Sequence, residues 1–148
     1  MASVERTITV SQPIAKVWAY LSDFTTTEEW DPPTVSTVRR SGDGGIGTTY
    51  SNVSKFLGYE TETQYVVTEH DVGRLLQLEG DAGSVKVLDT ITFEPSTDDT
   101  GNGRTSVTYR SEFHPMGAAK VVEPLLSPML KILGDKVAAS LEERLNAL

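Results

Sequence analysis

The sequence contains no cysteine, and this absence removes several kinds of chemistry at once. Disulfide bonds, thiolate metal ligands and cysteine nucleophiles are all excluded. Only two histidines are present, His70 and His114, and neither belongs to a spacing typical of a metal site. We therefore expect no metal ion and no cofactor, and the composition is compatible with a cytoplasmic protein.

Long apolar runs and an excess of basic residues are also missing. No stretch reaches the roughly 18 apolar residues that a membrane-spanning helix needs, and the N-terminal segment has no apolar core typical of a secretory signal. The formal net charge is −8. Because nucleic acids and anionic membranes are bound by clustered lysine and arginine, we expect no nucleic-acid partner and no membrane insertion.

What is present is a composition typical of a globular protein. The chain has 148 residues, of which 38% are hydrophobic and 23% charged. This length suits one domain with a sizeable core, so we expect residues 1–148 to form a single domain, as a monomer or a homodimer.

The N-terminal part predicts a strand followed by a helix. Residues 2–11 alternate between apolar and polar side chains, as in a half-buried strand. Ile14, Val17, Trp18 and Leu21 then recur at helical spacing. A short helical turn is expected before Trp30, where the prolines at 32 and 33 force an extended backbone.

The middle of the chain indicates six consecutive strands. Apolar and polar residues alternate in short runs that are separated by glycine-rich turns, with expected strands at 35–41, 48–55, 60–69, 75–79, 84–94 and 104–114. The glycine-rich run at 42–47 leads into one of these strands, which favours a hairpin turn over a phosphate-binding loop. The inward faces of strands 48–55 and 60–69 remain open, since Val66 opposes Tyr65 and Val67.

The C-terminal part, residues 117–148, predicts a long amphipathic helix. Apolar residues step by three and four along it, with a bend expected at Pro124, Pro128 or Gly134. Its apolar stripe comprises Val122, Leu125, Met129, Ile132, Leu133, Val137, Leu141, Leu145 and Leu148. Since its polar residues balance in charge, a sheet is a better partner for this stripe than a membrane surface. The predicted class is α+β, a seven-stranded curved antiparallel sheet wrapped around the C-terminal helix in the order β-α-β6-α.

Several motifs in this order resemble the START-like superfamily, also called helix-grip or SRPBCC, and within it the polyketide cyclase/dehydrase and lipid-transport family. The motifs are Val17-Trp18, "LSDF" at 21–24, the Trp-x-Pro at 30–32, the glycine-rich hairpin at 42–47, "DTITFEP" at 89–95, "RTSVTY" at 104–109 and "EPLL" at 123–126. The resemblance covers essentially the whole chain. It implies the helix-grip fold and a cavity between the concave sheet and the C-terminal helix.

The inward residues of the strands and of the C-terminal helix are then the candidate ligand contacts. We predict Trp30, Leu76, Leu78, Val87, Ile91, Phe93, Val107, Tyr109, Ser111, Phe113, Leu126, Met129, Leu130 and Leu133. Trp30 has two interpretations that stay open, a packing wedge at a corner or a wall of the cavity. Trp18 is predicted to be plain core.

Three functions are compatible with these residues. The first is binding or transport of a small hydrophobic or amphipathic molecule, such as a lipid, a polyketide or an aromatic metabolite. The second is a polyketide cyclase or dehydrase, in which Asp89 or Tyr109 would transfer protons. The third is an interaction scaffold without a ligand. Convergence of Asp89, Tyr109 and Ser111 on one void of several hundred Å³ would favour the first two.

Overall fold

Seven antiparallel strands form one sheet in the computed structural model, which describes residues 2–56, 58–97 and 103–148. The strands are β1 (Ala2–Val10), β2 (Thr34–Ser41), β3 (Thr49–Phe56), β4 (Tyr59–Asp71), β5 (Leu75–Asp81), β6 (Val85–Thr97) and β7 (Gly103–Pro115). Their order across the sheet is β1-β7-β6-β5-β4-β3-β2. The predicted six-strand meander is confirmed. The first strand, β1, pairs with β7 and forms one edge of the sheet.

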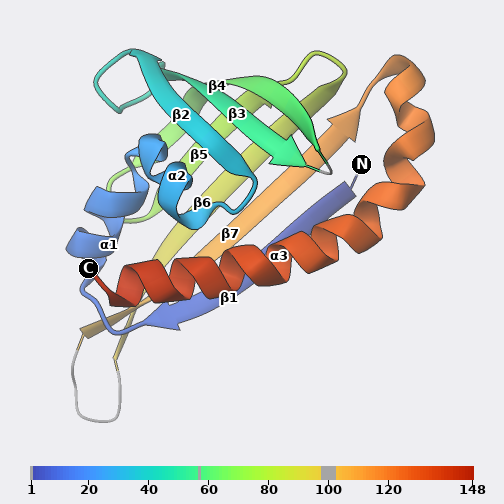
Figure 1. The fold of residues 1–148 in the computed structure, drawn as a ribbon. Helices are drawn as coiled ribbons and strands as arrows, with labels where there is room; N and C mark the ends of the chain where they lie inside the picture. The colour runs from blue at the N-terminus through green and yellow to red at the C-terminus, as the bar shows by residue number, and fades with distance from the viewer. Residues whose placement is uncertain (1, 57, 98–102) are drawn as a thin grey trace.

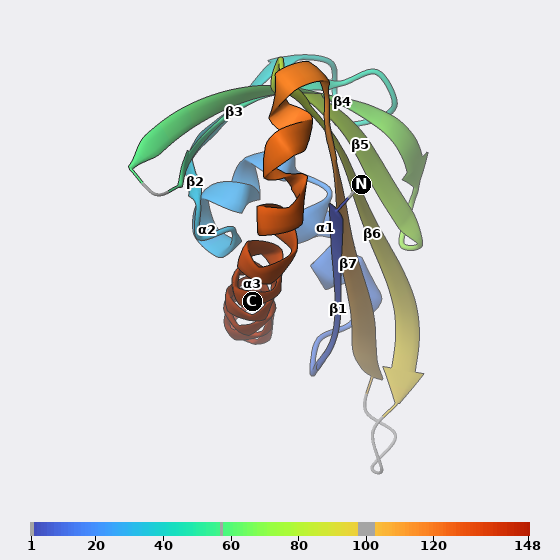
Figure 2. The same ribbon diagram turned by 90° about the vertical axis from the view of Figure 1, so that its right-hand side faces the viewer.

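The helical elements lie within the curve of this sheet. They are α1 (Ile14–Leu21), η1 (Phe24–Thr26), α2 (Thr27–Trp30), η2 (Gly117–Val122) and α3 (Glu123–Asn146). Figure 1 shows α3 running along β1, with α1 and α2 beside its C-terminal end. In Figure 2 all three helices lie under the arch of the sheet. The predicted helix-grip architecture is confirmed. No helix of the described residues is long and apolar enough to cross a membrane.

The contact between α3 and β1 depends on a glycine. A Cβ atom on Gly134 would overlap the side chain of Val4 and would lie 3.2 Å from the guanidinium carbon of Arg6. Arg6 in turn donates hydrogen bonds to Asp135 Oδ1 (3.0 Å) and to the backbone oxygen of Lys131 (3.1 Å). Gly134 therefore lets the helix approach the strand closely.

The buried stripe of α3 differs in part from the predicted one. Its buried residues are Leu130, Gly134, Val137, Leu141 and Leu145. The prediction was wrong for Val122, Leu125 and Ile132, which are 42%, 65% and 63% exposed. Simple three- and four-residue steps can start from several residues, and the apolar residues of this segment are numerous enough to fit more than one stripe.

One end of the sheet is a tightly packed core under α1. Trp18 packs edge-on against Phe93, with ring centroids 5.1 Å apart, and against His70 at 5.2 Å. The apolar side chains beneath α1 are fully or almost fully buried, namely Val10, Leu76, Leu78, Ile91, Phe93 and Val107. The prediction that Trp18 is core is confirmed.

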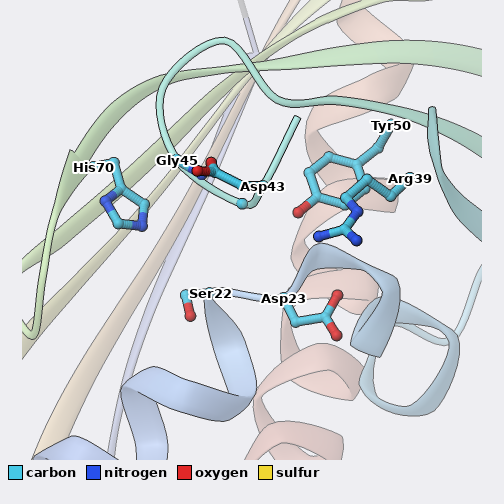
Figure 3. Close-up of a pocket in the computed structure, with 8 residues that line it drawn as sticks. Ser22, Asp23, Arg39, Asp43, Gly45, Tyr50 and His70 are labelled. Atoms are coloured by element: carbon cyan, nitrogen blue, oxygen red, sulfur yellow. The ribbon is translucent and has the colours of Figure 1, made fainter. Parts of the chain in front are cut away.

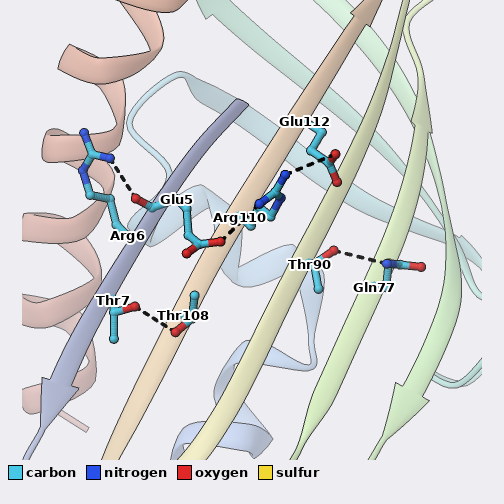
Figure 4. Close-up of polar contacts among 8 residues, drawn as sticks. All are labelled: Glu5, Arg6, Thr7, Gln77, Thr90, Thr108, Arg110 and Glu112. Atoms are coloured by element: carbon cyan, nitrogen blue, oxygen red, sulfur yellow. Dashed lines mark hydrogen bonds and ion pairs between the residues drawn. The ribbon is translucent and has the colours of Figure 1, made fainter. Parts of the chain in front are cut away.

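The outer face of the sheet is polar and partly solvated (Figure 4). Thr7 and Thr108 hydroxyls pair at 2.9 Å across β1 and β7. Arg110 lies between two carboxylates, 3.4 Å from Glu5 and 3.5 Å from Glu112. An antiparallel sheet with one wet face must direct its other face inward, and this is the face that receives the helices.

Candidate functional site

A cavity of about 350 Å³ lies between α3 and the inward face of the sheet. This volume is within the range of small-molecule binding sites. Residues from β1, β3, β4, β6 and β7 form one side of it, and α2 with the turn after it closes one end. Beneath α1, by contrast, apolar side chains fill the space inside the sheet.

The α3 side of the cavity is apolar. Its contributing residues share one face of the helix and are Leu126, Met129, Leu130, Leu133 and Val137. Leu130 and Val137 are 5% and 2% exposed, so they also anchor the helix to the rest of the core. A ligand that lies against this side would meet aliphatic side chains and no charge.

The sheet side carries a cluster of hydroxyl groups around one carboxyl. Ser111 Oγ donates to Asp89 Oδ1 at 2.5 Å, and the Tyr109 hydroxyl lies 3.4 Å from the same oxygen. The Tyr65 side chain also lies near this carboxyl and acts to lower its pKa. Asp89, Tyr109 and Ser111 thus converge on one cavity, because the β6–β7 register sets Asp89 directly opposite Ser111.

Tyr65 reaches this cluster because the neighbouring strand has a glycine opposite it. Gly80 pairs with Tyr65 in the β4–β5 register. A Cβ atom at position 80 would lie 2.7 Å from Tyr65 Cε1 and 2.9 Å from Thr63 Cγ2, closer than real atoms approach. The tyrosine ring therefore lies over β5 and extends towards Asp89 on β6.

A second carboxyl enters the cavity from the turn after α2. Pro32 and Pro33 end the helix, and Asp31 before them has the extended backbone that a residue preceding proline prefers (φ −100°, ψ 103°). The turn closes with a hydrogen bond from Thr34 N to Asp31 O at 2.9 Å. Thr34 Oγ1 also donates to Asp31 Oδ2 at 2.6 Å, which holds the carboxylate in place.

Asp31 is tied to β3 and β2 by a continuous polar network. Asn52 Nδ2 donates to Thr34 Oγ1 (3.0 Å) and to Thr37 Oγ1 (2.9 Å). Thr37 and Thr27 hydroxyls pair at 2.6 Å, and Thr27 donates onward to a backbone oxygen. Because each of these buried groups has a partner, the network fixes the polar wall rather than destabilising it.

Both carboxyls have raised proton affinities. Burial raises the pKa of Asp89 to about 6, against the opposing effect of its hydrogen bonds from Ser111, Tyr65 and Tyr109. Burial also raises the pKa of Asp31 to about 6, and the charge of Asp89 adds to the effect. The pKa values of Tyr65 and Tyr109 are raised well above their usual range, first by burial and then by the nearby carboxylates. The tyrosines are therefore hydrogen-bond donors at neutral pH.

Trp30 fills both roles that the sequence left open. It is 1% exposed, and its Nε1 donates to Thr26 Oγ1 at 3.1 Å, so it is packed at the corner between α2 and the sheet. Its ring also meets the Tyr109 ring edge-on at 5.7 Å and forms part of the cavity wall.

The structure separates the predicted contact residues into two groups. Nine line the cavity, namely Trp30, Val87, Tyr109, Ser111, Phe113, Leu126, Met129, Leu130 and Leu133. Five lie instead in the packed core beneath α1 and do not line it, namely Leu76, Leu78, Ile91, Phe93 and Val107. All five point to the predicted face of the sheet. Ile91, Phe93 and Val107 lie beyond the lining residues of their strands, and Leu76 and Leu78 lie on β5, of which no described residue lines the cavity.

Sequence reasoning missed several polar lining residues. They are Thr27, Asp31, Asn52, Ser54, Thr61, Thr63 and Tyr65. The inward positions of β3 and β4 face the cavity and are largely polar. These strands therefore lack the alternation of apolar and polar residues from which an inward face is predicted. The Asp-Pro-Pro turn was visible in the sequence and could have suggested Asp31, since its prolines force the chain to change direction beside Trp30.

A second hollow, of about 390 Å³, lies near the β2–β3 loop (Figure 3). Arg39 and His70 contribute to it together with Asp23 and Asp43, so its charges are mixed. The other histidine, His114, is exposed near the end of β7. Within the described ranges no group of three or more His, Asp or Glu side chains could hold a metal ion.

Comparison with known proteins gives a family and a fold. The family model described as "Polyketide cyclase / dehydrase and lipid transport" matches residues 1–146. No curated protein sequence matches the chain. Among solved structures, a START superfamily protein from Mycobacterium smegmatis is 14% identical, with 99% of each chain covered and a TM-score of 0.78.

Two further structures agree with this fold. Zhui aromatase/cyclase from Streptomyces sp. R1128 is 17% identical, and the match covers 98% of this chain and 91% of that one with a TM-score of 0.73. TTHA0849 from Thermus thermophilus is also 17% identical, covering 98% and 97% with a TM-score of 0.78. At these identities the likeness shows the fold alone.

Proposed function

Because the chain belongs to the polyketide cyclase/dehydrase and lipid transport family, we propose that it binds one small amphipathic molecule in the cavity under α3. The observation that carries this proposal is the two-sided wall of the cavity. One side is aliphatic and comes from α3, and the other holds Asp31, Asp89 and their hydroxyl partners. Such sites bind a ligand through apolar contact and orient it through a few polar groups.

The ligand lies with its apolar body along α3 and its polar end against β6 and β7. In this pose Leu130 and Leu133 cover the body, while the Asp89 carboxyl and the Tyr109 hydroxyl meet the polar end. The opposite orientation would bury polar atoms against aliphatic side chains without partners, which is unfavourable.

Native mass spectrometry of the purified protein tests this proposal. We expect a stoichiometric bound mass, or uptake of one molecule when small amphipathic compounds are added. Met129→Trp places a bulky ring at the cavity wall and should abolish the bound mass. The matched control is Leu125→Trp, one turn away on an exposed side of α3, which should leave it intact. Binding that survives Met129→Trp would contradict the proposed location.

A second candidate function is proton transfer during ring closure, as in a cyclase. The observation that favours it is the Asp89 carboxyl beside the Tyr109 and Ser111 hydroxyls in a cavity, where burial raises its pKa to about 6. A group with this pKa can give and take protons near neutral pH. If the protein is an enzyme, Asp89→Asn will keep ligand binding but lose product formation from a poly-β-ketone substrate, and if it is a carrier, no product will form with either protein.

A further inference from the structure

Among the described residues, the cavity contains acidic groups but no basic group. Asp31 and Asp89 line it, and within the described part of the chain no lysine, arginine or histidine does. Buried carboxylates are ordinarily matched by a cation or by several donors. The partners here are neutral hydroxyls, from Thr34 to Asp31 and from Ser111 and Tyr109 to Asp89. Neutral donors therefore satisfy both carboxyls, but among the described residues no cation of the site balances their charge.

The basic side chains of β1 and α3 nearest to the cavity do not point into it. Arg6 on β1 donates to Asp135 Oδ1, to the backbone oxygen of Lys131 and to that of Glu5. Lys131 is exposed on the outer side of α3. Neither side chain lines the cavity, so α3 and β1 bring no titratable group to it.

Aromatic rings stand beside the two acids. Trp30 and Tyr109 meet edge-on with centroids 5.7 Å apart, and Phe24 and Tyr65 do so at 5.1 Å. All four residues line the cavity. An organic cation is attracted to aromatic rings as well as to carboxylates, so aromatic side chains in this wall are compatible with a positively charged ligand.

We infer that the cavity selects an amphipathic amine, whose protonated nitrogen lies between Asp31 and Asp89 while its apolar body lies against α3. This inference rests on the proposed function and names the ligand class. A fatty acid or another carboxylate would add a negative charge beside two acids and is disfavoured. An alcohol can use the same hydroxyl network, but it gains no charge attraction.

Three ligands of one shape test the inference: 4-phenylbutylamine, 4-phenylbutanol and 4-phenylbutanoate. Each is titrated into the protein by calorimetry at pH 7.5. We expect the amine to bind about ten- to hundredfold more tightly than the alcohol, the range expected for a hydrogen bond to a charged group. The carboxylate should bind most weakly of the three.

A paired variant tests whether the two acids cause the preference. Asp31→Asn with Asp89→Asn keeps the side-chain shapes and removes both charges, so the amine should bind no more tightly than the alcohol. The control, Glu69→Gln with Glu79→Gln, removes two exposed charges from β4 and β5 and should keep the preference. A preference that is equal in both variants would mean that the overall negative charge causes it, and would overturn the inference.

The same ligands give a test that needs no variant. The titratable groups that face the amine are Asp31 after α2, Tyr65 on β4, Asp89 on β6 and Tyr109 on β7. The tyrosines stay protonated, so only the acids change charge between pH 5 and pH 7.5. The amine should bind more tightly at the higher pH, and the alcohol should show little change.

The possible outcomes distinguish a failure of the amine preference from a failure of the proposed ligand-binding function. Tightest binding by the alcohol or the carboxylate, or equal binding by all three, would overturn the amine preference and leave the proposed ligand site standing. Failure of all three to bind, with no bound mass in native spectra, would overturn both.

Discussion

The inward face of the sheet is packed at one end and hollow at the other, and the same strands build both ends. On β6, Ile91 and Phe93 lie in the core under α1, whereas Val87 and Asp89 line the cavity. On β7, Val107 is in the core and Ser111 lines the cavity. Side-chain direction alternates identically along each strand, so what differs is whether other side chains fill the space over it.

This comparison explains why a polar group can be buried at the hollow end. Asp89 is 3% exposed, as is Phe93 four residues later. The carboxyl is tolerated because hydroxyls from the neighbouring strands satisfy it. At the packed end, apolar side chains fill the space instead.

The largest expected difference comes from removing a phenylalanine at each end. Phe93→Ala should lower the free energy of unfolding by ~3–5 kcal/mol, because the core around Trp18 cannot collapse into the space left. Phe113→Ala on β7 removes the same atoms from the cavity wall and should cost less than half as much. Urea denaturation measures both, and equal losses would mean that the cavity end is as tightly packed as the core.

The next effect is a fall in stability with rising pH. Asp89 has a folded-state pKa of about 6 against an ordinary value of 3.8, so between these values the folded chain holds a proton that the unfolded chain has released. The free energy of unfolding should therefore fall as pH rises from about 4 to about 6, by on the order of 3 kcal/mol for this group.

Two substitutions separate this fall from other titrations. Asp89→Asn should remove the contribution of Asp89, leaving the similar contribution of Asp31. Asp81→Asn is the control, since the pKa of Asp81 is lowered by its hydrogen bond from Lys86 and its effect has the opposite sign at lower pH. A pH profile unchanged by Asp89→Asn would contradict the raised proton affinity.

A smaller effect is expected where α3 contacts β1. Gly134→Ala would normally help a helix, but here the added methyl meets Val4 and should cost ~1–3 kcal/mol. Val4→Ala in the same chain should recover part of the loss, and thermal unfolding of the two single variants and the double variant gives the coupling between them. Simple addition of the two losses would show that the positions are independent.

The two ends of the sheet also differ in how well their residues could be predicted from the sequence. Period-two alternation placed Val87, Ile91 and Val107 on the correct face, and the turn signals gave the strand order. Alternation carries no information on whether neighbouring side chains fill the space over an inward residue. Packed and lining residues on β6 and β7 were therefore predicted together.

The inward faces of β3 and β4 could not be assigned from the sequence for a related reason. The inward positions of β3 include Asn52, and those of β4 include Thr63 and Tyr65, so polar residues occur on both faces. Their partners, such as Thr34 and Thr37, come from another strand and become visible only once the chain is folded. A buried polar network hides the pattern that a buried apolar face would show.

The smallest effect should come from the outer face, where the ion pairs are exposed to solvent. Arg110 lies near Glu5 and Glu112 at 3.4 and 3.5 Å, in the arrangement of an ion-pair network, but all three side chains keep contact with solvent. Exposed pairs gain little, and salt screens them. Arg110→Ala should leave the unfolding midpoint within replicate error at high salt and change it only slightly at low salt. A loss of stability comparable to that of Gly134→Ala would contradict this expectation. It would mean that the outer ion pairs stabilise the pairing of β1 with β7 as much as the close contact between β1 and α3 does.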